Sequence, residues 1–207
     1  MINPVIVPFI IFGYLLQMVE LIFFPLPSDF TTYNILQKQN PVFTASKSTM
    51  AVLILGTVIS MITFLVPGLI ILFPESRTLL HFINLEFDGL HVFSVLLIIA
   101  GSLLTLFGVL KISKLKRYKT EIGIIQSGIF RFTRNPITLG LNFLVIGFFL
   151  ALPALEMLGG CIIYIINAHI RVRMEEQQLQ LNHGKVFKNY KNNVPRYMNI
   201  KPVFDLF

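Results

Sequence analysis

Two polar stretches of an otherwise apolar chain carry residue types that could hold a charged ligand. The first, residues 123–140, places Arg134, Asn135 and Pro136 at the start of an apolar run. Asparagine can cap a helix and proline fits its first position, so Asn135 and Pro136 predict a helix start. A helix N-terminus beside the guanidinium of Arg134 would bind a carboxylate or a phosphate well. The alternative role for Arg134 is contact with lipid headgroups.

The second stretch, residues 167–197, predicts a polar helix that continues the last apolar run. Two sets of side chains share a helix face by their spacing: His169, Arg173 and Glu176, and Arg171 with Glu175. Such pairs usually do no more than stabilise an exposed helix. Adjacent Glu175 and Glu176 cannot both face one partner, so one could pair with an arginine while the other points into a cavity.

Beyond this helix, aromatic residues offer either a ligand surface or packing area. Gly184 predicts the end of the helix, because glycine is common just past a helix C-terminus. Phe187, Tyr190 and Tyr197 follow it. The residue types alone fit both a stacking surface for a ligand and packing against the membrane face.

The elements that position these stretches are predicted membrane helices. The chain of 207 residues is 55% hydrophobic and 13% charged, whereas soluble domains carry about 25% charged residues. About 20 apolar residues span the hydrocarbon core. The five predicted spans are Val5–Phe24, Met50–Phe73, Leu90–Ile112, Ile137–Leu152 and Leu155–Ile170. The last two are short and meet at Pro153 and Ala154, which predicts a tight helical hairpin.

Charge predicts the orientation of these spans. All lysines and arginines except Lys38, Lys47 and Arg77 lie between Lys111 and Lys201. They form two clusters, which the positive-inside rule places in the cytoplasm. The sequence therefore predicts a multi-pass integral membrane protein with its N-terminus outside and its C-terminus in the cytoplasm.

Several other functions are disfavoured by what the sequence lacks. Cys161 is the only cysteine, which excludes an internal disulfide and a cysteine-based metal cluster. The four histidines show no metal-ligand spacing, so no metal is expected. The basic residues come without a nucleic-acid-binding motif, and topology with headgroup contact explains them better than nucleic acid.

In order and spacing, the two stretches resemble the C-terminal half of the isoprenylcysteine carboxyl methyltransferase and phospholipid methyltransferase family of membrane enzymes. That pattern reads Gly-x-Tyr, Arg-His-Pro-x-Tyr-x-Gly, an apolar hairpin, Arg-x-x-x-Glu-Glu, Gly-x-x-Tyr-x-x-Tyr and a basic tail. The matching residues are Gly128, Phe130, Arg134, Asn135, Pro136, Thr138, Gly140, Arg171, Glu175, Glu176, Gly184, Phe187, Tyr190 and Arg196. Asn135 replaces the histidine of the family and Thr138 its tyrosine. The resemblance covers about residues 120–200, and the first three predicted spans show no family motif.

This resemblance implies S-adenosylmethionine as cofactor, bound at the cytoplasmic ends of the last spans and covered by the C-terminal segment. It makes Arg134 and Glu176 the candidate catalytic residues. The cofactor carboxylate suits Arg134, and its amine and ribose hydroxyls suit Glu175 or Glu176. Its adenine suits Phe187 or Tyr190. The candidate cofactor-binding residues are Gly128, Phe130, Asn135, Pro136, Thr138, Gly140, Arg171, Glu175, Glu176, Phe187, Tyr190 and Arg196.

The sequence thus predicts an all-α membrane helical bundle, with N-terminal helices in residues 1–112 and a methyltransferase core in residues 113–207. The expected partners are membrane lipids and a lipophilic or small-molecule methyl acceptor that reacts through a carboxylate, a thiol or an amine. Two alternatives stay open. One is a non-catalytic membrane protein that keeps the fold as a structural or ligand-binding subunit. The other is a small transporter, which would need more polar residues at mid-membrane than the spans contain.

Overall fold

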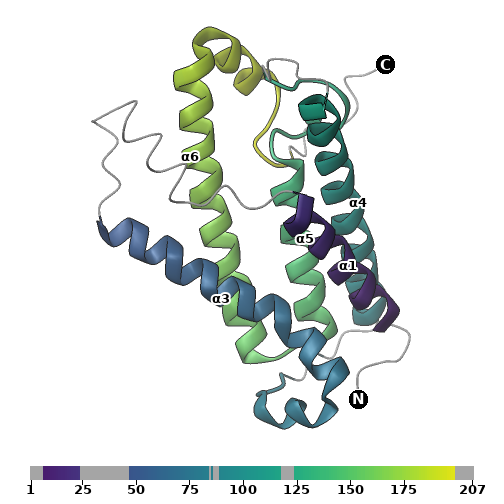
Figure 1. Cartoon of the computed structure of the whole chain (residues 1–207). Coiled ribbons are helices and arrows are strands. Elements are labelled where there is room, and N and C mark those ends of the chain that lie inside the picture. The colour runs from purple at the N-terminus through teal and green to yellow at the C-terminus, as the bar shows by residue number, and fades with distance from the viewer. Residues whose placement is uncertain (1–6, 24–46, 84, 86–88, 118–123, 199–207) are drawn as a thin grey trace.

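The computed structural model describes residues 7–23, 47–83, 85, 89–117 and 124–198 (Figure 1). Its helices are α1 (Val7–Phe23), α3 (Lys47–Leu72), α4 (Leu90–Arg117), α5 (Pro136–Ala151) and α6 (Leu155–Asn193), with the 3-10 helices η1 (Pro74–Leu79) and η2 (Gly128–Arg131). Within these ranges the only β-type pairing is an isolated bridge between Phe82 and Ala154. The predicted all-α membrane bundle is confirmed.

Each predicted span overlaps one of the five α-helices in the described part of the chain. Three described helices are long and apolar enough to cross a membrane: Ile54–Leu72 within α3, Leu90–Ile112 within α4, and α6. The apolar α5 has 16 residues and α1 has 17, both short of the about 20 that a perpendicular span needs. The protein is therefore an integral membrane protein, and the count of five spans stays a prediction.

Helix α6 is much longer than a membrane crossing. Its part before Gly184, residues 155–183, extends for roughly 44 Å at 1.5 Å per residue, which exceeds the hydrocarbon core of about 30 Å. The apolar sequence ends at Ile170, so the charged second half projects beyond the other helices, as Figure 1 shows at the upper end of α6. Gly184 then adopts φ +45°, and the helix axis breaks there, as predicted.

Small residues bring α4 and α5 into close contact. A Cβ atom on Gly140 would lie 2.6 Å from the carbonyl oxygen of Gly101 and 2.8 Å from the amide nitrogen of Thr105. Ser94 Oγ also donates a hydrogen bond to the carbonyl of Gly147 at 2.9 Å. Lipid tails are as apolar as the helices, so close van der Waals packing and such hydrogen bonds hold membrane helices together.

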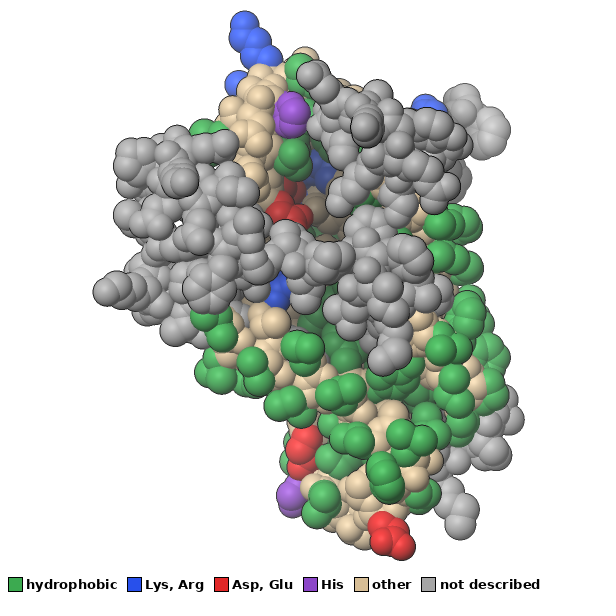
Figure 2. Space-filling view, in the orientation of Figure 1, with side chains coloured by type: hydrophobic (Ala, Val, Ile, Leu, Met, Phe, Trp, Pro, Cys, Tyr) green, Lys and Arg blue, Asp and Glu red, His purple; other side chains and the backbone are tan. Residues whose placement is uncertain are grey.

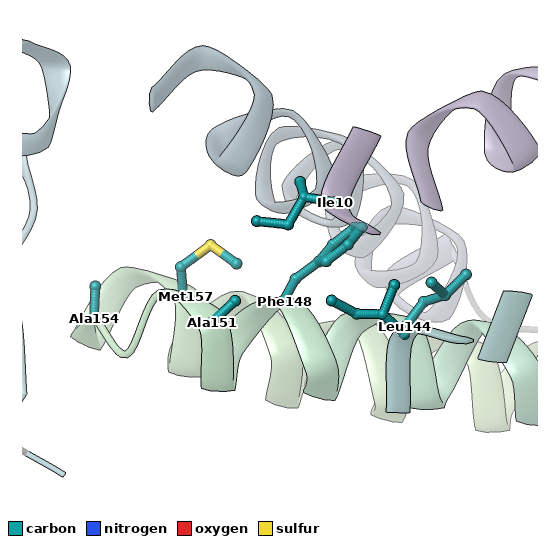
Figure 3. Packing of buried hydrophobic residues seen from close by; sticks show 7 residues of the cluster. Ile10, Leu144, Phe148, Ala151, Ala154 and Met157 are labelled. Carbon is teal, nitrogen blue, oxygen red and sulfur yellow. The ribbon is translucent and has the colours of Figure 1, made fainter. Parts of the chain in front are cut away.

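A buried apolar cluster joins α1, α4 and the hairpin of α5 and α6 (Figure 3). Its buried members are Ile10, Ile98, Leu144, Phe148, Ala151, Ala154 and Met157. Phe148 lies at its centre, stacked on Tyr14 with ring centroids 5.4 Å apart. This cluster keeps the short hairpin against the rest of the bundle.

The turn of the hairpin is fixed by the loop that precedes α4. The amide of Ile83 donates to the carbonyl of Pro153 at 2.7 Å, and the amide of Leu155 donates to the carbonyl of His81 at 2.9 Å. His81 Nδ1 lies 2.6 Å from Glu156 Oε1. The predicted hairpin through Pro153 and Ala154 is present, since α5 ends at Ala151 and α6 begins at Leu155.

The predicted orientation depends on segments that lie largely outside the described residues. These include most of the loop from Pro25 to Thr49, residues 86–88 and residues 118–123. The placement of the N-terminus outside and the C-terminus in the cytoplasm stays a prediction.

The contact at Gly140 gives a test of the α4–α5 packing. We expect Gly140→Ala to lower the free energy of unfolding by about 1–3 kcal/mol, because the new methyl group would overlap two backbone atoms of α4. Gly159→Ala is the matched control, since a Cβ there meets no atom within 4 Å. Alanine should leave that helix unchanged or stabilise it by up to about 1 kcal/mol. Thermal unfolding in detergent measures both, and equal midpoints would contradict the packing described.

Candidate active site

Three segments that are distant in the sequence meet at the polar end of the α5–α6 hairpin. They are residues 128–136 before α5, the polar part of α6, and the segment Val194–Met198, which we call the C-terminal segment. The break at Gly184 turns the chain back, so that this segment reaches the start of α5. Figure 2 shows basic and acidic side chains in the upper part of one face, above a mostly hydrophobic lower part.

Glu176 lies between two arginines that come from different segments. Arg196 donates to both of its carboxylate oxygens, from Nε to Oε1 at 3.0 Å and from Nη2 to Oε2 at 2.7 Å. Arg134 Nη2 lies 3.3 Å from Oε1. The side chains of Arg134 and Glu176 are only 7% and 8% exposed, so both charges are largely removed from water. We call Arg134, Glu176 and Arg196 the ion cluster.

The electrostatics of the ion cluster follow from burial and mutual attraction. Burial alone would raise the pKa of Glu176, but the hydrogen bond from Arg196 and the charges of both arginines hold it below its usual value. Burial lowers the pKa of Arg134, and Glu176 opposes that shift. The hydrogen bond to Glu176 raises the pKa of Arg196. At neutral pH the cluster therefore holds two positive charges and one negative charge.

Arg134 has two further side-chain donors inside the protein. Its Nε and Nη1 atoms are buried and have no hydrogen-bond partner within the described residues. Leaving buried N–H groups of a charged side chain unpaired is costly. Arg134 also stands directly before α5, where the amides of the first helical turn lack intrahelical acceptors. This arrangement fits a ligand that carries an anionic group.

The start of α5 binds the C-terminal segment through three hydrogen bonds. The amide of Arg134 donates to the carbonyl of Pro195 at 3.0 Å. Thr133 Oγ1 and Asn135 Nδ2 donate to the carbonyl of Arg196 at 3.1 and 3.2 Å. The predicted capping role of the Asn135 side chain is wrong, since it makes no cap hydrogen bond to α5. The side-chain amide of Asn135 binds the C-terminal segment instead. Pro136 takes the first helical position, as predicted.

The aromatic residues after Gly184 pack inside the protein. Phe187, Tyr190 and Val194 form a buried cluster with Ile124 and Leu179 at its edge. Tyr190 Oη donates to the carbonyl of Phe130 at 2.6 Å, and burial raises the pKa of Tyr190 to about 12. The rings of Phe187 and Tyr190 therefore pack inside the protein and not against the membrane face, and their contact with a cofactor stays a prediction.

The remaining candidate residues are more dispersed. Arg171 points to α3, where its Nη2 donates to Thr57 Oγ1 at 2.5 Å. Glu175 is exposed, and Gly140 lies against α4 as described above. Gly128 is exposed and adopts φ +65° at the start of η2, a conformation that favours glycine. Thr138 is half-buried in the first turn of α5.

Two threonines at this end of the bundle make contacts that were not predicted from the sequence. Thr133 and Thr57 both hold arginine-containing segments through their hydroxyl groups. Hydroxyl residues are common in membrane helices and loops, and only the folded chain brings these two to their partners. Among the described residues, no three His, Cys, Asp or Glu side chains gather in a way that could hold a metal ion.

Comparison with known proteins gives a family match for part of the chain. The sequence model of the phospholipid methyltransferase family matches residues 90–186. The match confirms the predicted resemblance, and it includes α4, η2, α5 and most of α6, with Arg134 and Glu176. It begins at Leu90, so it also takes in the third predicted span, where no family motif was recognised. No match was found among curated proteins or among solved structures.

Removing the charge of Glu176 tests the ion cluster. We expect Glu176→Gln to lower the free energy of unfolding by about 3 kcal/mol or more, because Arg134 would remain buried without its counter-charge. Glu175→Gln is the matched control at the adjacent, exposed position, with an expected loss of at most about 1 kcal/mol. Thermal or denaturant unfolding in detergent measures both, and equal losses would contradict the burial described.

A comparison of wild type with Glu176→Gln at different pH values tests the charge of Glu176. Glu176 has a lowered pKa in the folded state, so its stabilising effect is complete above the usual carboxyl pKa of about 4.3. The effect is lost as the pH falls through the lowered value. The difference in unfolding free energy between wild type and Glu176→Gln should therefore be constant near neutral pH and shrink in acid. A difference that stays the same down to about pH 2 would show that the carboxylate charge is not its source.

Proposed function

We propose that this membrane protein transfers a methyl group from S-adenosylmethionine to a lipophilic or small apolar acceptor, because the sequence model of the phospholipid methyltransferase family matches residues 90–186. By the resemblance of the sequence pattern, the activity would be like that of an isoprenylcysteine carboxyl methyltransferase. A carboxylate, a thiol or an amine could accept the methyl group.

The observation that carries this proposal is the pair of unused donors on Arg134. S-adenosylmethionine has an amino-acid carboxylate. Its oxygens could accept hydrogen bonds from the buried Nε and Nη1 atoms of Arg134. The amides of the first turn of α5 would add partial positive charge at the same place. Asn135, Pro136 and Arg196 lie directly around Arg134, and we include them in the cofactor site.

Within this proposal the residues of the chain bind and orient. The bound cofactor would supply an electrophilic methyl group on a sulfonium. Arg134 would anchor the carboxylate, while Glu176 would fix the guanidinium of Arg134 in place and leave its other two nitrogens free for the ligand. Phe187 and Tyr190 would support the site by holding the C-terminal segment, since their rings are enclosed. Orientation of this type can provide a large part of the rate enhancement in a direct transfer.

The position of the site suits an acceptor that stays in the bilayer. The ion cluster belongs to the polar end of the bundle, and large hydrophobic side chains are exposed along the helices below it, including Phe93, Leu96, Leu103 and Phe107 of α4. An acceptor could therefore keep its apolar part among lipid tails while its reactive group reaches the polar end. With the predicted orientation, the water-soluble cofactor would enter from the cytoplasm.

Cofactor binding by two arginine variants tests the proposal. Calorimetry with S-adenosylhomocysteine should show saturable binding to the detergent-purified wild type, and Arg134→Ala should weaken it about tenfold or more, as expected for lost hydrogen bonds to a charged group. Arg131→Ala is the matched control, because Arg131 is an exposed arginine three residues away in η2. No binding by the folded wild type up to about 1 mM would favour the non-catalytic alternative. Equal weakening by both variants would remove Arg134 from the site.

A further inference from the structure

The carbonyl group of Arg196 accepts two side-chain hydrogen bonds, which come from Thr133 and Asn135. Arg134 lies between these two residues in the sequence, and its backbone amide donates to the carbonyl of Pro195, the residue before Arg196. Three consecutive residues before α5 thus hold two consecutive carbonyls of the C-terminal segment. The backbone position of Arg196 is therefore set by the start of α5.

Thr133 has the central place in this arrangement. The residue is 3% exposed, and its hydroxyl acts in two directions. It donates to the carbonyl of Arg196 at 3.1 Å and accepts from the amide of Asn135 at 3.3 Å. A hydroxyl can donate once and accept twice, so Thr133 is well suited to fix the C-terminal segment and the entry into α5 together.

The side chain of Arg196 connects this backbone contact to the ion cluster. Its guanidinium binds both oxygens of Glu176, and Glu176 in turn contacts Arg134. If the carbonyl of Arg196 moved, the guanidinium would lose its two-point geometry on Glu176. Glu176 would then be free to take other orientations toward Arg134, and the two unused nitrogens of Arg134 would no longer be held in one position.

We propose that Thr133 is a positioning residue for the cofactor: by binding the Arg196 carbonyl it keeps the C-terminal segment docked and thereby sets the affinity of Arg134 for the cofactor carboxylate. This inference rests on the proposed function. Thr133 lies outside the ion cluster, yet it would contribute to cofactor affinity through Arg196 and Glu176.

Thermodynamic linkage gives this inference a second consequence. If docking of the C-terminal segment strengthens cofactor binding, then cofactor binding must strengthen docking by the same factor. The peptide bond after Arg196 is a trypsin site within the docked segment, so its cleavage rate reports how often the segment opens. A purely structural threonine would affect stability without linking cleavage to the cofactor.

The experiment compares wild type, Thr133→Val, Thr133→Ser and Thr78→Val as full-length proteins in detergent. Valine keeps the shape of threonine and removes the hydroxyl, whereas serine restores it. Thr78→Val is the matched control, because Thr78 Oγ1 also donates to a backbone carbonyl, that of Glu75 at 2.8 Å, in η1. The readouts are the Kd for S-adenosylhomocysteine by calorimetry and the trypsin cleavage rate after Arg196 by mass spectrometry, with and without that ligand.

We expect Thr133→Val to raise the Kd about three- to tenfold, in line with the loss of one hydrogen bond, and to speed cleavage by a similar factor. Serine should restore both values, and Thr78→Val should change neither. S-adenosylhomocysteine should slow cleavage of the wild type. The inference is overturned if the ligand binds without slowing cleavage, or if Thr133→Val speeds cleavage while the Kd stays unchanged. No binding by the folded wild type overturns the proposed function as well.

Discussion

A buried carboxylate between two arginines is the interaction on which the polar end of this protein depends. Glu176 is largely removed from water and keeps its charge because Arg196 and Arg134 both face it. Removing one partner of a buried ion pair leaves an uncompensated charge and strongly destabilises the folded protein. The three segments that supply these residues must therefore all be in place for the folded structure to be stable. The break at Gly184 and the buried rings of Phe187 and Tyr190 serve this requirement, since they bring the C-terminal segment back to the start of α5.

The same interaction explains why the site suits an anionic group. The ion cluster holds one negative and two positive charges, and two nitrogens of Arg134 have no partner among the described residues. An additional carboxylate would balance the charge and satisfy these donors. The membrane helices contribute a rigid support to the site and no charge. Close contacts between α4 and α5 hold α5 in place, and α5 begins at Pro136 beside the ion cluster. The family match over residues 90–186 includes both the packed helices and the two central charges, Arg134 and Glu176.

Much of the fold could be predicted from the sequence because membrane helices have a strong local signal. Long apolar runs marked the five α-helices that the structure describes, Pro136 marked the start of α5, and Gly184 marked the break in α6. The order of motifs also pointed to Arg134 and Glu176. The side-chain partners could not be predicted, because they depend on the path of the chain after Gly184. Asn135 has the sequence features of a helix cap, yet its amide meets the returning carbonyl of Arg196. Thr133 showed no local signal, since its role appears only when residues 133 and 196 are neighbours.

The central claim is that the unused donors of Arg134 bind the carboxylate of S-adenosylmethionine. Nuclear magnetic resonance of the protein labelled with nitrogen-15 arginine tests it most directly. The Nε–H signal of Arg134, assigned with an Arg134→Lys variant, would be followed while S-adenosylhomocysteine is added in detergent. We expect a saturable shift of this signal that is larger than the shift of exposed Arg131 or Arg173. An unchanged Arg134 signal at saturating ligand would show that the cofactor carboxylate is bound elsewhere or that this protein binds no such cofactor.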